Sequence, residues 1–310
     1  MDGLIAVTGA TGWVGRTVID ELQRLISPEE FKIRVTPFAS REGRLALSDN
    51  TYLRILPLEA LPELAVREPL SALIHCAFLT PDRLHALGEE TFIAMNRKIT
   101  DLASKALEAR PTTRVIEISS GAATLVETGL DEAVWSPSTA HQLYGALKLD
   151  EERRLSSIAP SLILRVYALT GRWMRDPKKY ALGDFLLQAA ARKRITIRAP
   201  HPVIRSYGNA SNIAELALHW LLSEDTPPSK AIPAVNATVS LEELALMVSN
   251  HFDLPAPIAD VDSSLPMDIY CAEASGYTEM ARTYGVKIKS LDRQIVDSAL
   301  AITKSLEYLA

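Results

Sequence analysis

The chain has little cysteine, no excess of basic residues and no long apolar run, and each lack excludes a class of protein. Only two of its 310 residues are cysteines, Cys76 and Cys271, and they form no CxxC pair. The sequence therefore indicates neither a disulfide framework nor a zinc site, and it predicts no metal. The formal net charge is −5, which argues against a nucleic-acid partner because such proteins usually carry a basic surface.

The location expected from the sequence is cytoplasmic. Met1-Asp2-Gly3 passes straight into an apolar run, without the charged region and cleavage site of a signal peptide. No apolar stretch approaches the about 20 residues that span a bilayer, so we expect no membrane partner. Two isolated cysteines suit a reducing compartment.

Short apolar runs alternate with helix-like segments as far as Tyr167, which predicts a doubly wound parallel α/β sheet of the Rossmann type. We expect residues 1–168 to form this domain, together with about 203–225, and residues 169–310 to form mainly a smaller α/β substrate lobe with a discontinuous boundary. The predicted strands are Leu4–Thr8, Lys32–Phe38, Tyr52–Leu56, Ala72–Ala77, Arg114–Ser119 and Ser161–Tyr167. The predicted helices of the first domain are Trp13–Leu25, Glu89–Ala109 and Leu143–Leu155.

A glycine-rich segment, Thr8-Gly9-Ala10-Thr11-Gly12-Trp13-Val14-Gly15, joins the first strand to the first helix. Glycines at this place permit a tight turn, a close approach of backbone to a pyrophosphate, and close packing of helix on sheet. The amides of residues 12–14 then point at the phosphates near the positive end of the helix dipole. The sequence predicts a dinucleotide site formed by Gly9, Thr11, Gly12, Trp13, Val14 and Gly15.

The end of the second strand favours NADP(H) over NAD(H), although NAD(H) stays possible. NAD-binding folds commonly have a carboxylate there that binds the ribose 2′-hydroxyl, whereas this chain reads Phe38-Ala39-Ser40-Arg41. Arg41 could pair with a 2′-phosphate, and Arg16 could supply a second cation.

Tyr144 and Lys148 stand four residues apart, so they share one face of a helix. An ammonium group near a phenol favours the phenolate, which lets tyrosine exchange a proton near neutral pH. Ser119 and Ser120 close the fifth strand, where a hydroxyl can bind a carbonyl oxygen. The sequence therefore predicts hydride transfer with Ser120, Tyr144 and Lys148 as catalytic residues, and Phe78 is added to the substrate site.

With these motifs the chain resembles the extended short-chain dehydrogenase/reductases, which include NAD(P)-dependent sugar-nucleotide epimerases, dehydratases and reductases. Thr8–Gly15 is similar to their TGxxGxxG turn, and His75-Cys76-Ala77 to their fourth-strand motif beside the cofactor. The resemblance implies a homodimer and an enzyme. It also implies that Cys76, Ala77, Asn96, Ser119, Tyr144 and Lys148 contact the cofactor, that Ser120 rather than Ser119 is the catalytic serine, and that Arg205, in Arg205-Ser206-Tyr207, binds the diphosphate of a nucleotide sugar.

Two departures from the family pattern narrow the function. Ala168 stands where the family often has a substrate-binding asparagine, and Gly121-Ala122 stand where 4,6-dehydratases carry Asp-Glu. The sequence thus predicts first an NADPH-dependent reductase of a keto-sugar nucleotide. The alternatives are a sugar-nucleotide 4-epimerase with tightly bound NAD, a reductase of a non-sugar ketone or aldehyde, and a non-catalytic NADP(H) sensor.

Overall fold

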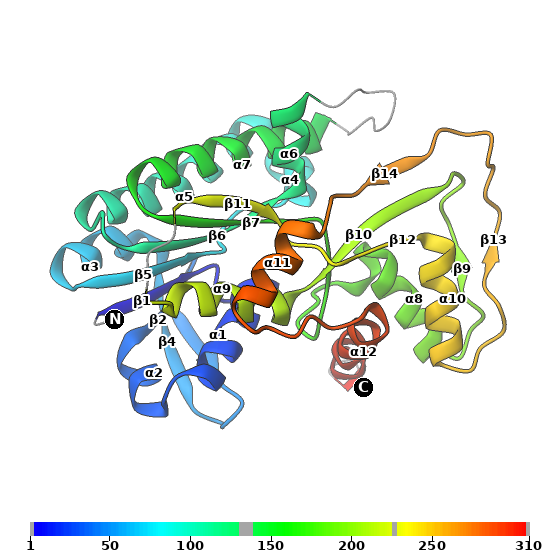
Figure 1. Ribbon diagram of the computed structural model, residues 1–310, viewed down its shortest axis with the longest axis horizontal. Coiled ribbons are helices and arrows are strands. Elements are labelled where there is room, and N and C mark those ends of the chain that lie inside the picture. The colour runs from blue at the N-terminus through cyan, green and yellow to red at the C-terminus, as the bar shows by residue number, and fades with distance from the viewer. Residues whose placement is uncertain (1–2, 130–138, 225–227, 308–310) are drawn as a thin grey trace. The chain divides into compact units, whose positions relative to one another are not determined.

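The computed structural model describes residues 3–129, 139–224 and 228–307 (Figure 1). The chain forms two compact units. The first comprises residues 1–129, 137–165 and 213–232, and the second comprises residues 130–136, 166–212 and 233–310. None of the helices within the described ranges is long and apolar enough to cross a membrane.

The first unit is built on an eight-stranded sheet with the order β11-β7-β6-β5-β1-β2-β4-β3. The pairs β1–β2, β1–β5, β2–β4 and β5–β6 are parallel, and β3 is an antiparallel edge strand beside β4. The strands are β1 (Leu4–Thr8), β2 (Val35–Ala39), β3 (Gly43–Ala46), β4 (Tyr52–Pro57), β5 (Leu70–His75), β6 (Arg114–Ser120), β7 (Ser161–Val166) and β11 (Lys230–Pro233). The predicted Rossmann-type fold class is confirmed.

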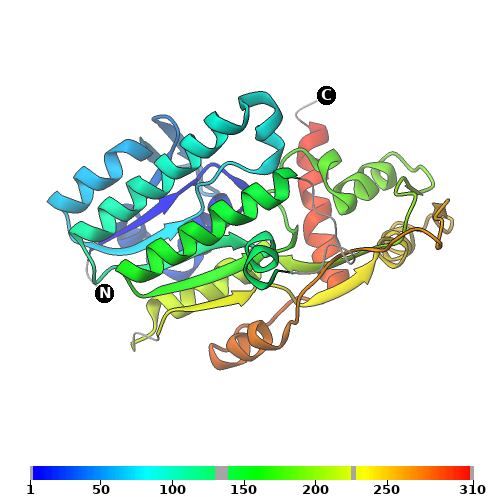
Figure 2. The ribbon, with the colours of Figure 1, turned by 90° about the horizontal axis from the view of Figure 1, so that it is seen from above.

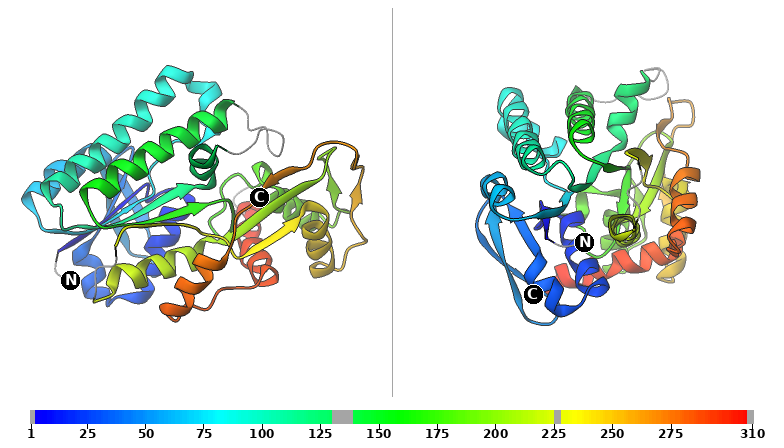
Figure 3. Two further views of the ribbon diagram at one scale, coloured as in Figure 1. Left: turned by 45° about the horizontal axis from the view of Figure 1, so that its top comes forward. Right: turned by 60° about the vertical axis from the view of Figure 1, so that its left-hand side comes forward.

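Helices cover both faces of this sheet. Three of them, α3 (Leu61–Arg67), α5 (Glu89–Ala109) and α7 (Thr139–Ile158), run side by side over one face (Figure 2), and α1 (Trp13–Leu25) and α9 (Ala210–Leu222) lie on the other (Figure 3). Between α3, α5 and the sheet lies a core of small and branched apolar side chains that are almost fully buried: Ala6, Leu61, Ala65, Leu73, Ala103, Leu107, Val115 and Leu155. This packing fixes the helices against the strands whose ends carry the site.

The sequence prediction differs from the structure around the second strand. Lys32 was expected in that strand, but α2 (Pro28–Arg34) continues through it and β2 starts only at Val35. The reason is a strong helix start: the Ser27 side chain accepts a hydrogen bond from the amide of Glu30, Pro28 occupies the first turn, and the acidic residues there suit the helix dipole.

The second unit has its own four-stranded sheet, in which β10 pairs with β12 on one side and with β14 and β8 on the other. Its strands are β8 (Ala168–Thr170), β9 (Thr196–Ile197), β10 (Val203–Asn209), β12 (Ala237–Ser240), β13 (Ile258–Ala259) and β14 (Asp268–Tyr270). Its helices are α8 (Ala181–Ala190), α10 (Leu241–His251), α11 (Ser275–Thr283) and α12 (Leu291–Glu307).

Candidate active site

The glycine-rich turn lies at the switch point of the large sheet. β1 has β2 on one side and β5 on the other, and ligands of such sheets bind outside the carboxyl ends of the strands where the order reverses. Gly9 has a φ of +62°, and a Cβ there would lie 2.7 Å from the carbonyl carbon of Cys76. Only glycine fits this approach between the turn and the end of β5.

Gly12 and Gly15 shape the start of α1. The amide of Gly12 donates to the Gly9 carbonyl at 2.8 Å, and a Cβ on Gly15 would lie 2.8 Å from the carbonyl carbon of Gly9. The first turn of the helix can therefore pack directly on the loop. A cradle of this kind fits a dinucleotide pyrophosphate, and the flanking Thr11, Trp13 and Val14 stay candidate contacts.

Thr8 ties the end of β1 to the end of β5. Its hydroxyl oxygen accepts hydrogen bonds from the amides of Cys76 and Ala77, at 3.1 and 3.2 Å, and lies 2.9 Å from Nδ1 of His75. The two predicted cofactor residues Cys76 and Ala77 thus border the glycine turn. Burial raises the pKa of the Cys76 thiol to about 12, so this cysteine stays protonated and is no nucleophile.

Asn96 is fully buried and holds the segment that follows β5. Its Oδ1 accepts from the amide of Leu79 at 2.8 Å, and its Nδ2 donates to the Leu79 carbonyl at 3.4 Å. These bonds fix the backbone next to Phe78, so the described contacts of Asn96 are with the chain itself. Its predicted contact with the cofactor stays a prediction.

The residues predicted to select the cofactor lie at the β2 end of the sheet. Arg41 is exposed directly after β2. Arg16 points elsewhere: its guanidinium donates to the carbonyl of Ala46 and lies 3.3 Å from the carboxylate of Asp20. Of the two, Arg41 is therefore the better candidate for a 2′-phosphate.

Ser120 and Tyr144 are brought together at the carboxyl end of β6. Ser120 caps α6 (Gly121–Thr128), where its Oγ accepts from the amide of Ala122 at 3.2 Å, and it also forms a hydrogen bond with Tyr144. Gly145 makes the approach possible, because a Cβ there would lie 2.8 Å from the carbonyl carbon of Ala122. This glycine lets α7 lie directly against α6.

Lys148 lies one turn further along α7 and is 2% exposed. Its ammonium donates to the carbonyl of Ile118 at 2.9 Å and to Glu151 at 2.6 Å, and it sits 4.0 Å from the ring centroid of Phe78. The same Phe78 ring packs edge-on against Tyr144, with centroids 5.7 Å apart. The predicted substrate residue Phe78 thus contacts both members of the tyrosine-lysine pair.

The electrostatics of Tyr144 are mixed. Burial raises the pKa of the phenol, the Lys148 ammonium lowers it, the Glu151 carboxylate raises it, and the hydrogen bond with Ser120 lowers it. The net direction is upward. Contrary to the sequence expectation of a lysine-lowered pKa, Tyr144 in the free protein is a phenol, because the carboxylate beside the lysine opposes the lysine's effect.

Ser119 points to the opposite face of β6 from Ser120, since side chains alternate along a strand. Its hydroxyl donates to Glu152, whose carboxylate forms a buried pair with Arg165 at 2.5 Å. Arg165 also contacts Glu127 at 2.6 Å. The described partners of Ser119 and Arg165 are therefore structural, and a cofactor contact of Ser119 stays a prediction.

Arg205 belongs to the second unit, on β10. Its guanidinium forms a hydrogen-bonded pair with Asp268 at 2.7 Å and donates to the carbonyls of Asp268 and Ile204 at 2.9 and 3.0 Å. Sequence reasoning missed Asp268, which lies far from Arg205 along the chain and in no motif. A diphosphate bound to Arg205 would have to compete with this carboxylate.

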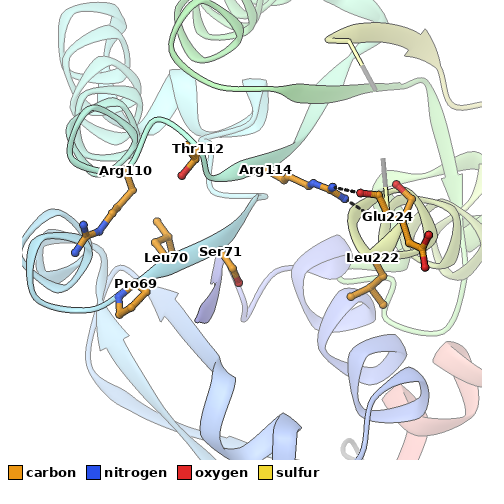
Figure 4. A pocket seen from close by; sticks show the side chains of 9 residues that line it. Pro69, Leu70, Ser71, Arg110, Thr112, Arg114, Leu222 and Glu224 are labelled. Carbon is orange, nitrogen blue, oxygen red and sulfur yellow. Dashed lines mark hydrogen bonds between the residues drawn. The ribbon is translucent and has the colours of Figure 1, made fainter. Parts of the chain in front are cut away.

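A cavity of about 580 Å³ lies in the first unit away from these residues (Figure 4). It is bordered by Ser71 at the amino end of β5 and Arg114 at the amino end of β6. Arg110 and Arg114 donate there to backbone carbonyls at the ends of α3 and α9. The two arginines thus cap helix ends, and the cavity is at the wrong edge of the sheet for a cofactor.

Comparisons with known proteins agree with this fold. Residues 5–233 match the model of the NAD dependent epimerase/dehydratase family. A search of the curated proteins by sequence finds no match. Among solved structures, the chain is similar to a UDP-N-acetylglucosamine 4-epimerase from Methanobrevibacter ruminantium M1 in complex with UDP-N-acetylmuramic acid, with 16% identity, a TM-score of 0.73 and coverage of 98% of this chain and 99% of the other.

Two further structures have the same fold. A UDP-glucose 4-epimerase from Thermotoga maritima with UDP-glucose has 15% identity and a TM-score of 0.70, covering 97% of this chain and 99% of the other. MoeE5 in complex with UDP-glucose and NAD has 17% identity and a TM-score of 0.68, covering 98% and 100%. The family match spans most of the chain and includes the glycine turn and the Ser-Tyr-Lys set. The chain therefore belongs to the NAD dependent epimerase/dehydratase family and is an NAD(P)-dependent enzyme of the extended short-chain dehydrogenase/reductase type.

Proposed function

We propose that the chain is a 4-epimerase of a nucleotide sugar that works with NAD(H) held at the glycine turn. The observation that carries the proposal is the grouping of Ser120, Tyr144 and Lys148 beside that turn. The similar solved structures support it, because their titles name 4-epimerases, UDP-sugars and NAD. This reverses the order of the sequence analysis, which ranked an NADPH-dependent reductase first.

The residues of the chain divide the work. When bound, the nicotinamide ring would accept a hydride from the sugar carbon and return it to the other face. Gly9, Gly12 and Gly15 would hold the pyrophosphate on backbone amides. Tyr144 would take the proton of the sugar hydroxyl and later give it back, with Ser120 orienting the oxygen. Lys148 would hold the site's positive charge.

Arg205 is the candidate for the diphosphate of the nucleotide sugar. Its planar fork suits two phosphate oxygens better than a lysine would. In the free protein Asp268 occupies that fork at 2.7 Å, so substrate binding would exchange one anion for another. The exchange keeps the guanidinium paired in both states.

A second candidate is an NADPH-dependent reductase of a keto-sugar nucleotide. Two observations favour it: Arg41 stands exposed where NAD-binding folds commonly have a carboxylate, and the pKa of Tyr144 is raised, which suits a proton donor. A homodimer and a preference for NADP(H) also stay predictions.

A substrate panel separates the two candidates. Purified protein is incubated with UDP-, dTDP-, CDP- and GDP-sugars, with NAD or with NADPH, and the anomeric proton signals are followed by NMR. The epimerase converts one sugar into its epimer with NAD in catalytic amount and without net change in NADH. The reductase leaves sugars unchanged but consumes NADPH with a keto-sugar nucleotide. If no nucleotide sugar binds or reacts, the proposal is wrong, and a reductase of non-sugar carbonyls takes its place.

A further inference from the structure

Two carboxyl groups that the proposed reaction does not use lie buried behind the catalytic lysine. Glu117 on β6 and Glu151 on α7 have no exposed surface. The carboxylate of Glu151 accepts from Lys148 at 2.6 Å and from Thr100 at 3.2 Å. Neither oxygen of Glu117 makes a hydrogen bond of ordinary geometry to a described residue.

The protonation state of the neighbouring His75 follows from geometry. The Thr8 hydroxyl already accepts two amide hydrogens, so its own hydrogen is donated to Nδ1 of His75. His75 is therefore neutral with its hydrogen on Nε2, and it donates to Glu151 at 3.1 Å. Glu151 thus accepts from three donors, of which only Lys148 is charged.

The two carboxyl groups differ in charge. Burial opposes the ionisation of Glu151, but the Lys148 ammonium outweighs burial and holds the pKa of Glu151 at about 2. Burial and the negative charge of Glu151 together raise the pKa of Glu117 well above its usual range. Glu117 is then a neutral acid, Glu151 an anion and Lys148 a cation, and the cluster carries no net charge.

We propose that Glu117 and Glu151 are positioning residues that share one proton and hold Lys148 in a neutral ion pair, which keeps Tyr144 a phenol in the resting enzyme. The inference rests on the proposed function in that Tyr144 must be the proton-transfer residue. The titratable groups around the ammonium are Tyr144 and Glu151 from α7, Glu117 from β6 and His75 from β5. Removing the ion pair would leave the lysine's charge to act on the tyrosine.

Titration of Tyr144 tests this directly in the full-length protein without substrate or cofactor. The tyrosine ring carbons are labelled with ¹³C, and the Tyr144 signal is identified by its absence in Tyr144→Phe. In the wild type we expect a phenol up to at least about pH 9, because the pKa is raised from a normal value of about 10. A phenolate below that pH would overturn the proposal whatever the variants do.

The variants should respond non-additively. Glu117→Gln leaves the Tyr144 midpoint unchanged, since Glu117 is already neutral. Glu151→Gln shifts the midpoint only slightly downward, because Glu117 ionises in its place. Glu117→Gln/Glu151→Gln lowers the midpoint by about 1–3 pH units, the effect of an uncompensated cation nearby. Asp150→Asn is the matched control: Asp150 is exposed on the same helix, and its removal should have no effect. An unshifted double variant, or an equal shift in Glu117→Gln alone, contradicts a shared proton.

Kinetics extend the test and separate it from the proposed function. If Tyr144 first acts as a base, kcat/KM rises with pH up to its pKa, and in the double variant this rise moves to lower pH by the same interval. If reduction is the reaction, kcat/KM instead falls above that pKa. If the titration shifts as expected but Tyr144→Phe keeps full turnover, the ion-pair account stands and the proposed function is wrong. If Tyr144→Phe loses turnover but the titration does not shift, the reverse holds.

Discussion

Gly15→Ala should damage the cofactor turn by a mechanism that the structure makes quantitative. A Cβ on Gly15 would lie 2.8 Å from the carbonyl carbon of Gly9 and 2.9 Å from Cα of Ala10, whereas carbon atoms prefer about 3.5–4.0 Å. Both neighbours are backbone atoms, so the overlap cannot be relieved by a side-chain rotation. Overpacking of this kind costs about 1–3 kcal/mol, and alanine returns about 1 kcal/mol through its helix propensity.

We therefore expect a loss of about 2 kcal/mol in the free energy of unfolding, measured by urea denaturation. We also expect at least about tenfold weaker cofactor binding by fluorescence, since the loss of a single well-placed hydrogen bond is worth about 1 kcal/mol. Gly43→Ala is the matched control: the nearest atom to its Cβ is Cδ1 of Ile55 at 3.8 Å, so stability should stay the same or rise by up to about 1 kcal/mol. Wild-type stability and cofactor affinity in Gly15→Ala would refute the close-packing account of the turn.

Three further substitutions test separate parts of the account. Arg41→Ala should weaken NADPH binding by about 1–3 kcal/mol in fluorescence titrations and leave NADH unaffected, whereas equal losses would rule out a 2′-phosphate contact. Arg205→Lys should raise KM for the nucleotide sugar with kcat and cofactor affinity unchanged, since the diphosphate lies away from the reacting carbon; a fall in kcat alone would contradict this role. Arg165→Met leaves Glu152 buried without its cation and should lower the free energy of unfolding in urea at pH 7 by about 3–5 kcal/mol, so a loss below about 1 kcal/mol would show the pair to be dispensable.

The parts of the fold and site that the sequence predicted are those encoded locally. The glycine turn follows from a strand, three glycines and a helix within about a dozen residues. Tyr144 and Lys148 are four apart on one helix, so their proximity needs no tertiary information. The alternation of strand and helix likewise predicts the parallel sheet. The edge strand β3 was missed because its short sequence, Gly43–Ala46, has no distinctive pattern.

The residues that sequence reasoning missed depend on contacts between distant segments. Glu117 comes from β6 and Glu151 from α7, and nothing in either segment shows that both are buried around one lysine. Glu151 stands three residues after Lys148, so its contact with the lysine could have been found from helical spacing, but its burial could not. The pair of Arg205 with Asp268 joins strands 63 residues apart. The direction of the Tyr144 pKa was expected wrongly for the same reason.

The central claim is that Tyr144 transfers the proton while the cofactor and the rest of the site stay intact. The most direct measurement compares Tyr144→Phe with the wild type in turnover of the nucleotide sugar found in the panel and in cofactor dissociation constant. The account predicts an unchanged dissociation constant and a rate lower by about 10²–10⁴-fold. A rate close to that of the wild type, with the protein folded and the cofactor bound, would contradict it.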